Sequence, residues 1–70
     1  MDFVLEKIRA DGHLGFRRND PLFQVWLDGR LVGHVWDAGG SWCADIEPNL
    51  QPLISADTRE AAAADLIARF

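Results

Sequence analysis

The sequence predicts an α+β domain in which a three- or four-stranded antiparallel β-sheet packs on one C-terminal α-helix. Two observations predict this class: alternating apolar stretches separated by turn residues over 22–46, and a capped, alanine-rich helical stretch over 57–70. With 70 residues, the chain is expected to form a single domain over 1–70.

The strongest local signal is a β-hairpin at Asp28-Gly29. The preceding stretch, 22–27, is rich in aromatic and branched side chains, as strands are. Asp-Gly supplies the positive φ angles of a two-residue type I′ turn, so 31–36 is the expected return strand. A second reversal over 37–40 then leads into a third strand over 41–46.

These turn lengths determine which residues share a sheet face, because side chains alternate along a strand. They place Phe23 opposite His34, His34 opposite Cys43, and Trp36 opposite Ser41. The face expected to meet the helix carries Leu22, Trp26, Leu31, Val35, Trp42, Ala44 and Ile46. The other face is expected to mix apolar and polar side chains, namely Phe23, Val25, Leu27, Val32, Trp36, Arg30, His34, Ser41, Cys43 and Asp45.

The N-terminal segment 1–21 leaves two alternatives open. Residues 2–10 fit a helix that Asp2 would cap, and they also fit a strand by alternation. The strand is favoured, because Asp11-Gly12 then forms a turn into 14–16.

The last third of the chain reads as a loop followed by a helix. Pro48 and Pro52 exclude a helix over 47–55 and leave Leu53-Ile54 as a short edge pairing. Asp57 and Glu60 have capping-box spacing. The apolar stripe of the helix consists of Ala62, Ala63, Leu66, Ile67 and Phe70.

Charge and composition narrow the function classes. The net charge of −4 comes entirely from residues 21–70, which disfavours binding to a phosphate backbone. The N-terminus has no signal-peptide pattern, and no apolar run reaches the roughly 20 residues of a membrane span. With one cysteine, we expect a cytoplasmic protein that has no internal disulfide and no contact with a membrane.

No pattern in the chain predicts an enzyme. His34 and Cys43, with Asp45 on the same face, have the residue types of a thiolate site, but a position in mid-strand offers no pocket or oxyanion donors. Cys43 is expected to be a buried filler and His34 a half-exposed sheet residue. No metal-ligand spacing or phosphate-binding glycine pattern is present, so neither metal nor cofactor is expected.

One helix cannot cover both sheet faces, so the second face needs another cover. The alternatives are the N-terminal segment, a second copy in a homodimer, or another protein. For a protein partner, the expected contact residues are Trp36 as anchor with Phe23, Val25, Val32, Arg30 and His34. The alternative function is a nucleic-acid-binding module that uses Arg17, Arg18 and Arg30.

Residues 42–66 resemble the HicB antitoxin family. The order is an aromatic-led strand from Trp42, a proline-containing loop over 48–55, and an Asp-Thr helix start at Asp57 with Glu60 and Ala61. The Pro-Gly of the family's loop is replaced by Gln51-Pro52, and an additional hairpin precedes the stretch. Such antitoxins block a small RNA-cleaving toxin, so the resemblance implies inhibition of a protein.

Two nucleic-acid folds show a similar element order. The hairpin over 23–33 is similar to that of double-stranded-RNA-binding domains, but their helix-start lysines are replaced by Thr58, Arg59 and Glu60. The plant ethylene-response-factor domain shares the order of three strands and a helix, but its sheet is basic. Both resemblances imply fold rather than function.

Together these observations predict a small, acidic, non-catalytic protein-binding module. We expect an inhibitor of bacterial or phage origin, of antitoxin or anti-defence type, whose protein partner is basic or nucleic-acid-binding.

Overall fold

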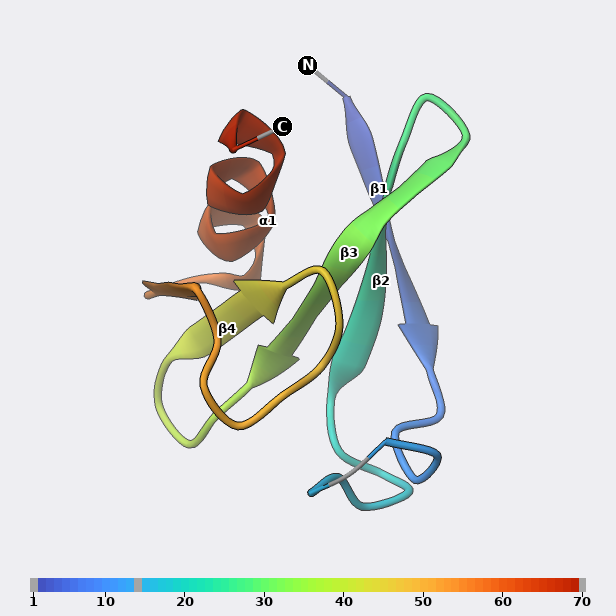
Figure 1. Cartoon of the computed structure of the whole chain (residues 1–70), viewed down its shortest axis with the longest axis vertical. Coiled ribbons are helices and arrows are strands. Elements are labelled where there is room, and N and C mark those ends of the chain that lie inside the picture. The colour runs from blue at the N-terminus through green and yellow to red at the C-terminus, as the bar shows by residue number, and fades with distance from the viewer. Residues whose placement is uncertain (1, 14, 70) are drawn as a thin grey trace.

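Within the described residues, the chain forms five antiparallel strands and one C-terminal helix, which confirms the α+β class (Figure 1). The computed structural model describes residues 2–13 and 15–69. The strands lie in sequence order across the sheet, as β1 to β5. Their bounds are β1 Phe3–Ile8, β2 Leu22–Leu27, β3 Arg30–Asp37, β4 Trp42–Asp45 and β5 Ile54–Ala56, followed by α1 Arg59–Ala68. The sheet therefore has more strands than the three or four predicted.

The strand alternative for the N-terminal segment is confirmed, with a different partner. β1 pairs with β2, from Phe3 opposite Leu27 to Ile8 opposite Leu22. The expected hairpin into 14–16 does not form, because Gly15 and Phe16 lie outside any strand. The predicted positions of Leu14 and of the terminal helix residue Phe70 lie outside the described residues.

The Asp28-Gly29 turn is confirmed. Both residues have positive φ, 52° and 78°, and Leu27 pairs with Arg30 across the turn. Two residues further from the turn the register shifts, because Trp26 pairs with Leu31 while Val25 pairs with Gly33. Val32 is therefore the extra residue of a β-bulge.

The bulge makes the predicted face assignment wrong for β2 and for the part of β3 before Gly33, while Val35, Trp42 and Ala44 lie on the helix face as predicted. Since side chains alternate, one extra residue exchanges the faces of β3 beyond it relative to those of β2. Phe23 therefore pairs with Val35, not with His34. Between β3 and β4 each residue pairs two positions further along β4 than predicted, so Trp36 lies opposite Cys43 and His34 opposite Asp45. A shift of two residues leaves the faces of β4 unchanged.

The helix covers the sheet face that carries Val25, Val35 and Ala44. The helix residues buried there are Ala62, Ala63, Leu66 and Ile67, as the apolar stripe predicted. Trp42 packs against this core as expected. Trp26 lies on the opposite face, because the pairs Trp26–Leu31 and Val25–Gly33 alternate across the sheet.

Gly33 allows the helix and β4 to approach β3 closely. A Cβ at this position would lie 2.6 Å from the Asp45 carbonyl oxygen and 2.7 Å from Leu66 Cδ2. Both separations are below van der Waals contact, so the sheet has room for glycine alone here.

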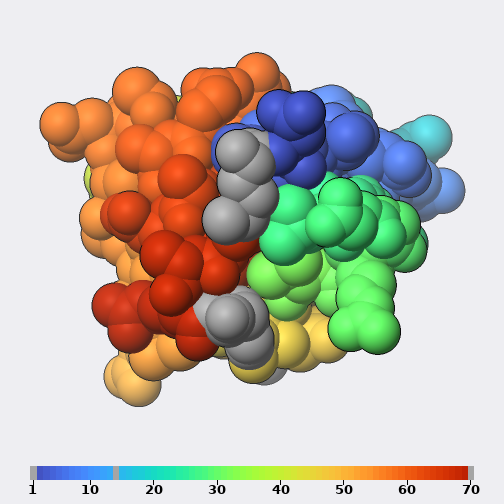
Figure 2. Space-filling view, turned by 90° about the horizontal axis from the view of Figure 1, so that it is seen from above, coloured from blue at the N-terminus to red at the C-terminus, as the bar shows by residue number. Residues whose placement is uncertain are grey.

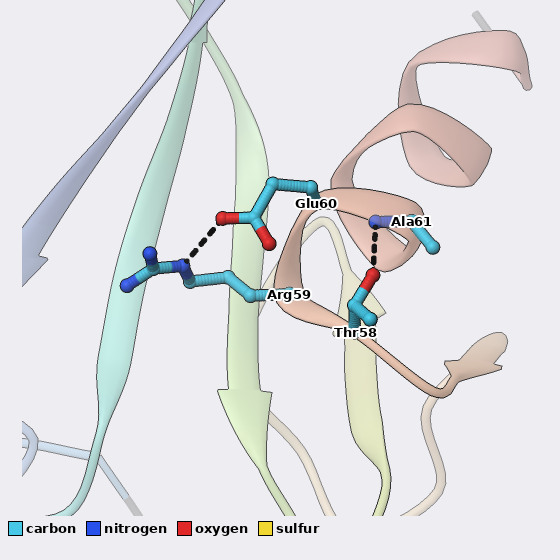
Figure 3. A network of polar contacts seen from close by, with 4 residues as sticks. All are labelled: Thr58, Arg59, Glu60 and Ala61. Atoms are coloured by element: carbon cyan, nitrogen blue, oxygen red, sulfur yellow. Dashed lines mark hydrogen bonds and ion pairs between the residues drawn. The ribbon is translucent and has the colours of Figure 1, made fainter.

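Thr58 caps the N-terminus of α1, one residue after the predicted Asp57. Its hydroxyl oxygen Oγ1 accepts a hydrogen bond from the backbone N–H of Ala61 at 3.0 Å (Figure 3). Arg59 Nε donates to Glu60 Oε2 at 3.1 Å, and its guanidinium lies 4.7 Å from the centroid of the Phe23 ring. The first helical turn is therefore attached to β2 of the sheet.

Replacement of Thr58 by alanine is expected to lower the free energy of unfolding by about 1 kcal/mol, because the Ala61 N–H loses its acceptor. Urea unfolding followed by circular dichroism measures the loss. Thr58→Ser keeps the hydroxyl and serves as the control. Equal losses in both variants would contradict the capping role of the hydroxyl.

Candidate partner-binding surface

The six residues predicted to form the contact surface do not lie on one surface. Phe23, Val25 and Val32 belong to the core beneath α1, and Val25 is fully buried. Trp36 and His34 lie on the opposite sheet face, where each is only 4% exposed. The remaining residue, Arg30, is exposed beside the β2–β3 turn.

Trp36 belongs to a second core on the sheet face that α1 does not cover. Trp36, Leu22, Cys43 and Ala10 form this buried cluster, against which Ile8 and Phe16 pack. The Phe16 ring meets the Trp36 ring edge-on, with centroids 5.7 Å apart. The segment that follows β1 therefore covers this part of the face, which is the first of the three alternatives.

His34 is buried rather than half-exposed, and its neighbour differs from the predicted one. Its Nδ1 donates a hydrogen bond to the Ile46 carbonyl oxygen at 2.8 Å, and its ring lies 5.9 Å from that of His13. Across the strands it faces Asp45, while Cys43 faces Trp36. Cys43 is a buried filler, as predicted.

Asp45 holds the loop between β4 and β5 against the sheet. Its carboxylate accepts hydrogen bonds from the backbone N–H of Ile46, the Asn49 side chain and the backbone N–H of Leu53. Burial raises the pKa of this carboxyl, but the three hydrogen bonds outweigh burial, so the pKa lies below its ordinary value. Its ionised form is thus favoured in the folded chain.

The three arginines of the nucleic-acid alternative do not form one patch. Arg17 and Arg18 are exposed in the segment before β2, and Arg30 is exposed at the start of β3. The two sites lie at opposite ends of the long axis of the molecule (Figure 1). A phosphate backbone would need to contact both ends to use all three charges.

An exposed apolar row remains on the sheet face opposite α1. Val4 pairs with Trp26, and Trp26 pairs with Leu31, so their side chains stand side by side on β1, β2 and β3. Val4 is 63% exposed, Leu31 is 46% exposed, and Trp26 is half-buried. We call Val4, Trp26 and Leu31 the apolar row.

The apolar row lies toward the β2–β3 hairpin end of the molecule. Figure 2, which views the molecule from this end, shows the start of β1 (blue) beside the hairpin (green), with α1 (red) on the other side. Trp26 Nε1 donates to Gln24 Oε1 at 3.3 Å, so the indole N–H has a partner within the same strand. The row centres on a tryptophan, a residue type that is enriched in protein–protein interfaces.

The bulge explains why the row was missed by sequence reasoning. Alternation correctly placed Trp26 and Leu31 on one face, but without the bulge that face also received Val35 and the helix. With Val32 bulged out, Val35 faces α1 as predicted, while Trp26 and Leu31 lie on the opposite face of the sheet.

Comparison of the chain with protein-family models, with curated proteins and with solved structures found no match. The resemblance of residues 42–66 to HicB antitoxins thus stays a prediction. Across residues 2–13 and 15–69, no helix is long and apolar enough to cross a membrane. The same part of the chain holds no group of three or more His, Cys, Asp or Glu side chains placed to bind a metal ion.

Proposed function

We propose that the chain is a small non-catalytic protein-binding module that acts by covering part of a partner's surface. The observation that carries this proposal is the apolar row, which exposes Val4 and Leu31 on either side of Trp26. The helix covers the other face of the sheet, so the row has no cover from α1. A contiguous exposed group of this kind is typical of a protein-interaction site.

The acidic charge favours a basic partner. The net charge of −4 attracts a positively charged surface and repels phosphate. Proteins that bind or cleave nucleic acids carry such surfaces. The specific form of the proposal is therefore an inhibitor of antitoxin or anti-defence type, from a bacterium or phage, that acts in the cytoplasm.

The first test is identification of the partner. Tagged protein is used to capture partners from a bacterial lysate with and without nuclease, and captured proteins are identified by mass spectrometry. A single basic protein that survives nuclease treatment is the expected result. Loss of every partner on nuclease treatment would mean that nucleic acid bridges the contacts, and would contradict the proposal.

Replacement of Trp26 by alanine is expected to weaken binding to the identified partner by at least about 2 kcal/mol, because Trp is a typical interface anchor. The free energy of unfolding is expected to change by only about 1 kcal/mol, since the ring is part-exposed. Titration calorimetry and urea unfolding measure the two effects. Leu53→Ala is the matched control, because Leu53 is also exposed, at 62%, but lies in the β4–β5 loop. Equal effects from both variants would place the interface elsewhere.

A further inference from the structure

A cleft of about 210 Å³ opens on the surface of the molecule. It lies where the segment before β2, the end of β3 and the β4–β5 loop meet. The residues that line it include Phe16, Asp20, Trp36, Asp37, Ala38 and Asn49. This volume is below the roughly 300–1,000 Å³ of ordinary cofactor and ligand pockets, so the cleft suits a single side chain.

Two aromatic residues are among those that line the cleft, the half-buried Phe16 and the buried Trp36. Phe16 and Trp36 meet edge-on with an interplanar angle of 81°, and both line the cleft. A cation placed against such rings is attracted by the negative potential of their faces. The fold already contains a contact of this kind, between Arg59 and Phe23.

Two carboxylates also line the cleft, and each keeps one oxygen available. Asp20 Oδ2 accepts from the Arg17 backbone N–H at 2.7 Å, and Asp37 Oδ1 accepts from the N–H groups of Gly39 and Gly40. Within the described residues, neither Asp20 Oδ1 nor Asp37 Oδ2 takes part in a hydrogen bond or ion pair. The Asp37 backbone N–H donates to the Pro21 carbonyl oxygen at 3.2 Å, which holds the two acidic residues on neighbouring parts of the chain.

We propose that this cleft receives an arginine side chain of the protein partner. The inference rests on the proposed function, because it assumes that the partner is a protein. Arginine fits better than lysine because its planar guanidinium both stacks on aromatic rings and donates to two acceptors at once. The net charge of −4 adds a favourable long-range field.

The cleft and the apolar row lie on the same side of the sheet. Trp36 and Trp26 belong to the same face, and Trp36 is paired with Leu22, four residues before Trp26 on β2. Four residues of strand span about 13 Å. A partner that buries an ordinary area of about 800 Å² on this molecule is therefore large enough to contact both.

The test is an NMR titration of the purified, ¹⁵N-labelled chain with Nα-acetyl-arginine methylamide. Expected shifts are confined to the Trp36 indole N–H and to backbone signals at the cleft, such as Ala38 and Asn49. The double variant Asp20→Asn, Asp37→Asn is expected to weaken binding about tenfold, the sum of two partly exposed charge pairs. The amide oxygens of asparagine can still accept the turn hydrogen bonds, so the cleft keeps its shape.

Matched control variants distinguish binding at the cleft from attraction by the net negative charge of the protein. Asp28→Asn, Asp65→Asn changes the net charge by the same amount far from the cleft, and Asn tolerates the positive φ of 52° at position 28. This variant is expected to bind as the wild type does. An equal loss in both double variants, or equal binding of the uncharged acetyl-citrulline analogue, would overturn the cleft as a cation site.

Two further outcomes of the titration test the choice of arginine and the location of the site. Equal binding of the acetyl-lysine analogue would overturn the choice of arginine, and the absence of shifts at the cleft would overturn the site. Arg17 and Arg18 are exposed on the segment that borders the cleft, but they are not among its lining residues. Because the titration uses the chain alone, its failure would leave the Trp26 test of the proposed function unaffected.

Discussion

Alanine at Trp36 is expected to leave the protein largely unfolded at 25 °C. Trp36 is 4% exposed and is the largest side chain of the second core. Truncation of a buried tryptophan costs about 3–5 kcal/mol, through lost burial and the cavity that remains. A single core in a domain of this size rarely supplies more than about 3–5 kcal/mol of net stability. The loss is therefore comparable to the whole stability.

Far-ultraviolet circular dichroism and urea unfolding measure this loss. Trp36→Phe retains an aromatic ring and is expected to remain folded with a smaller loss. Trp26→Ala is the second reference, because Trp26 is half-buried on the same sheet face. If Trp36→Ala instead unfolds at the wild-type urea concentration, the second core does not stabilise the fold.

Replacement of Leu66 by alanine is the other change with a large expected effect, about 3–5 kcal/mol. Leu66 is fully buried in the first core, and its Cδ2 lies over Gly33, where no side chain can fill the space it would leave. The neighbouring helix residues Ala62 and Ala63 are already small, so the site has little means to collapse. A residual cavity is therefore expected, so the loss in the free energy of unfolding should lie toward the upper end of this range.

Thermal and urea unfolding of Leu66→Ala provide the measurement. Asp65→Ala, on the exposed side of the same helical turn, is the control and is expected to change stability by about 0.5 kcal/mol or less. A Leu66→Ala loss as small as that of the control would mean that α1 does not pack on the sheet face assigned to it.

The elements with local signals could be predicted from the sequence. The Asp28-Gly29 turn depends on two residues that favour positive φ, and α1 depends on its cap and its alanine run. The buried stripe of α1 was also predictable, because helical periodicity determines which side chains point the same way. These features are determined by residues that are close together in the sequence.

The pairing partners and the bulge depend on non-local contacts. β1 fits a strand by alternation, but nothing within 3–8 indicates that it pairs with β2 rather than with the residues after Asp11-Gly12. One available signal for the bulge was Gly33, since glycine inside a strand often marks a bulge or a close backbone approach. Both apply here, because the pairing with β2 shifts beside Gly33 and because Asp45 and Leu66 lie close to it.

The candidate site was mispredicted for the same reason. Once Val32 is bulged, Phe23 and Val25 turn toward the helix, and three of the six expected contact residues become core. Burial of Trp36 and His34 depends on the segments after β1 and β4, whose paths follow from tertiary contacts such as those of Phe16 and Asp45. Periodicity carries no information about those paths.

The bulge at Val32 has a consequence for how this chain tolerates insertions and deletions. The two-residue turn pairs Arg30 with Leu27, on the side of the sheet that α1 covers, and the core requires Val35 on the same side. In a regular strand, residues five positions apart lie on opposite sides. The extra residue reconciles these two requirements. Loss of Val32 alone would leave Arg30, Leu31, Gly33, His34 and Val35 in regular alternation opposite the same partners on β2, so both faces would be kept. In the evolution of this hairpin, loss of one residue is therefore expected to be accepted at the bulge, where it changes neither the turn nor the side of the sheet that Val35 faces.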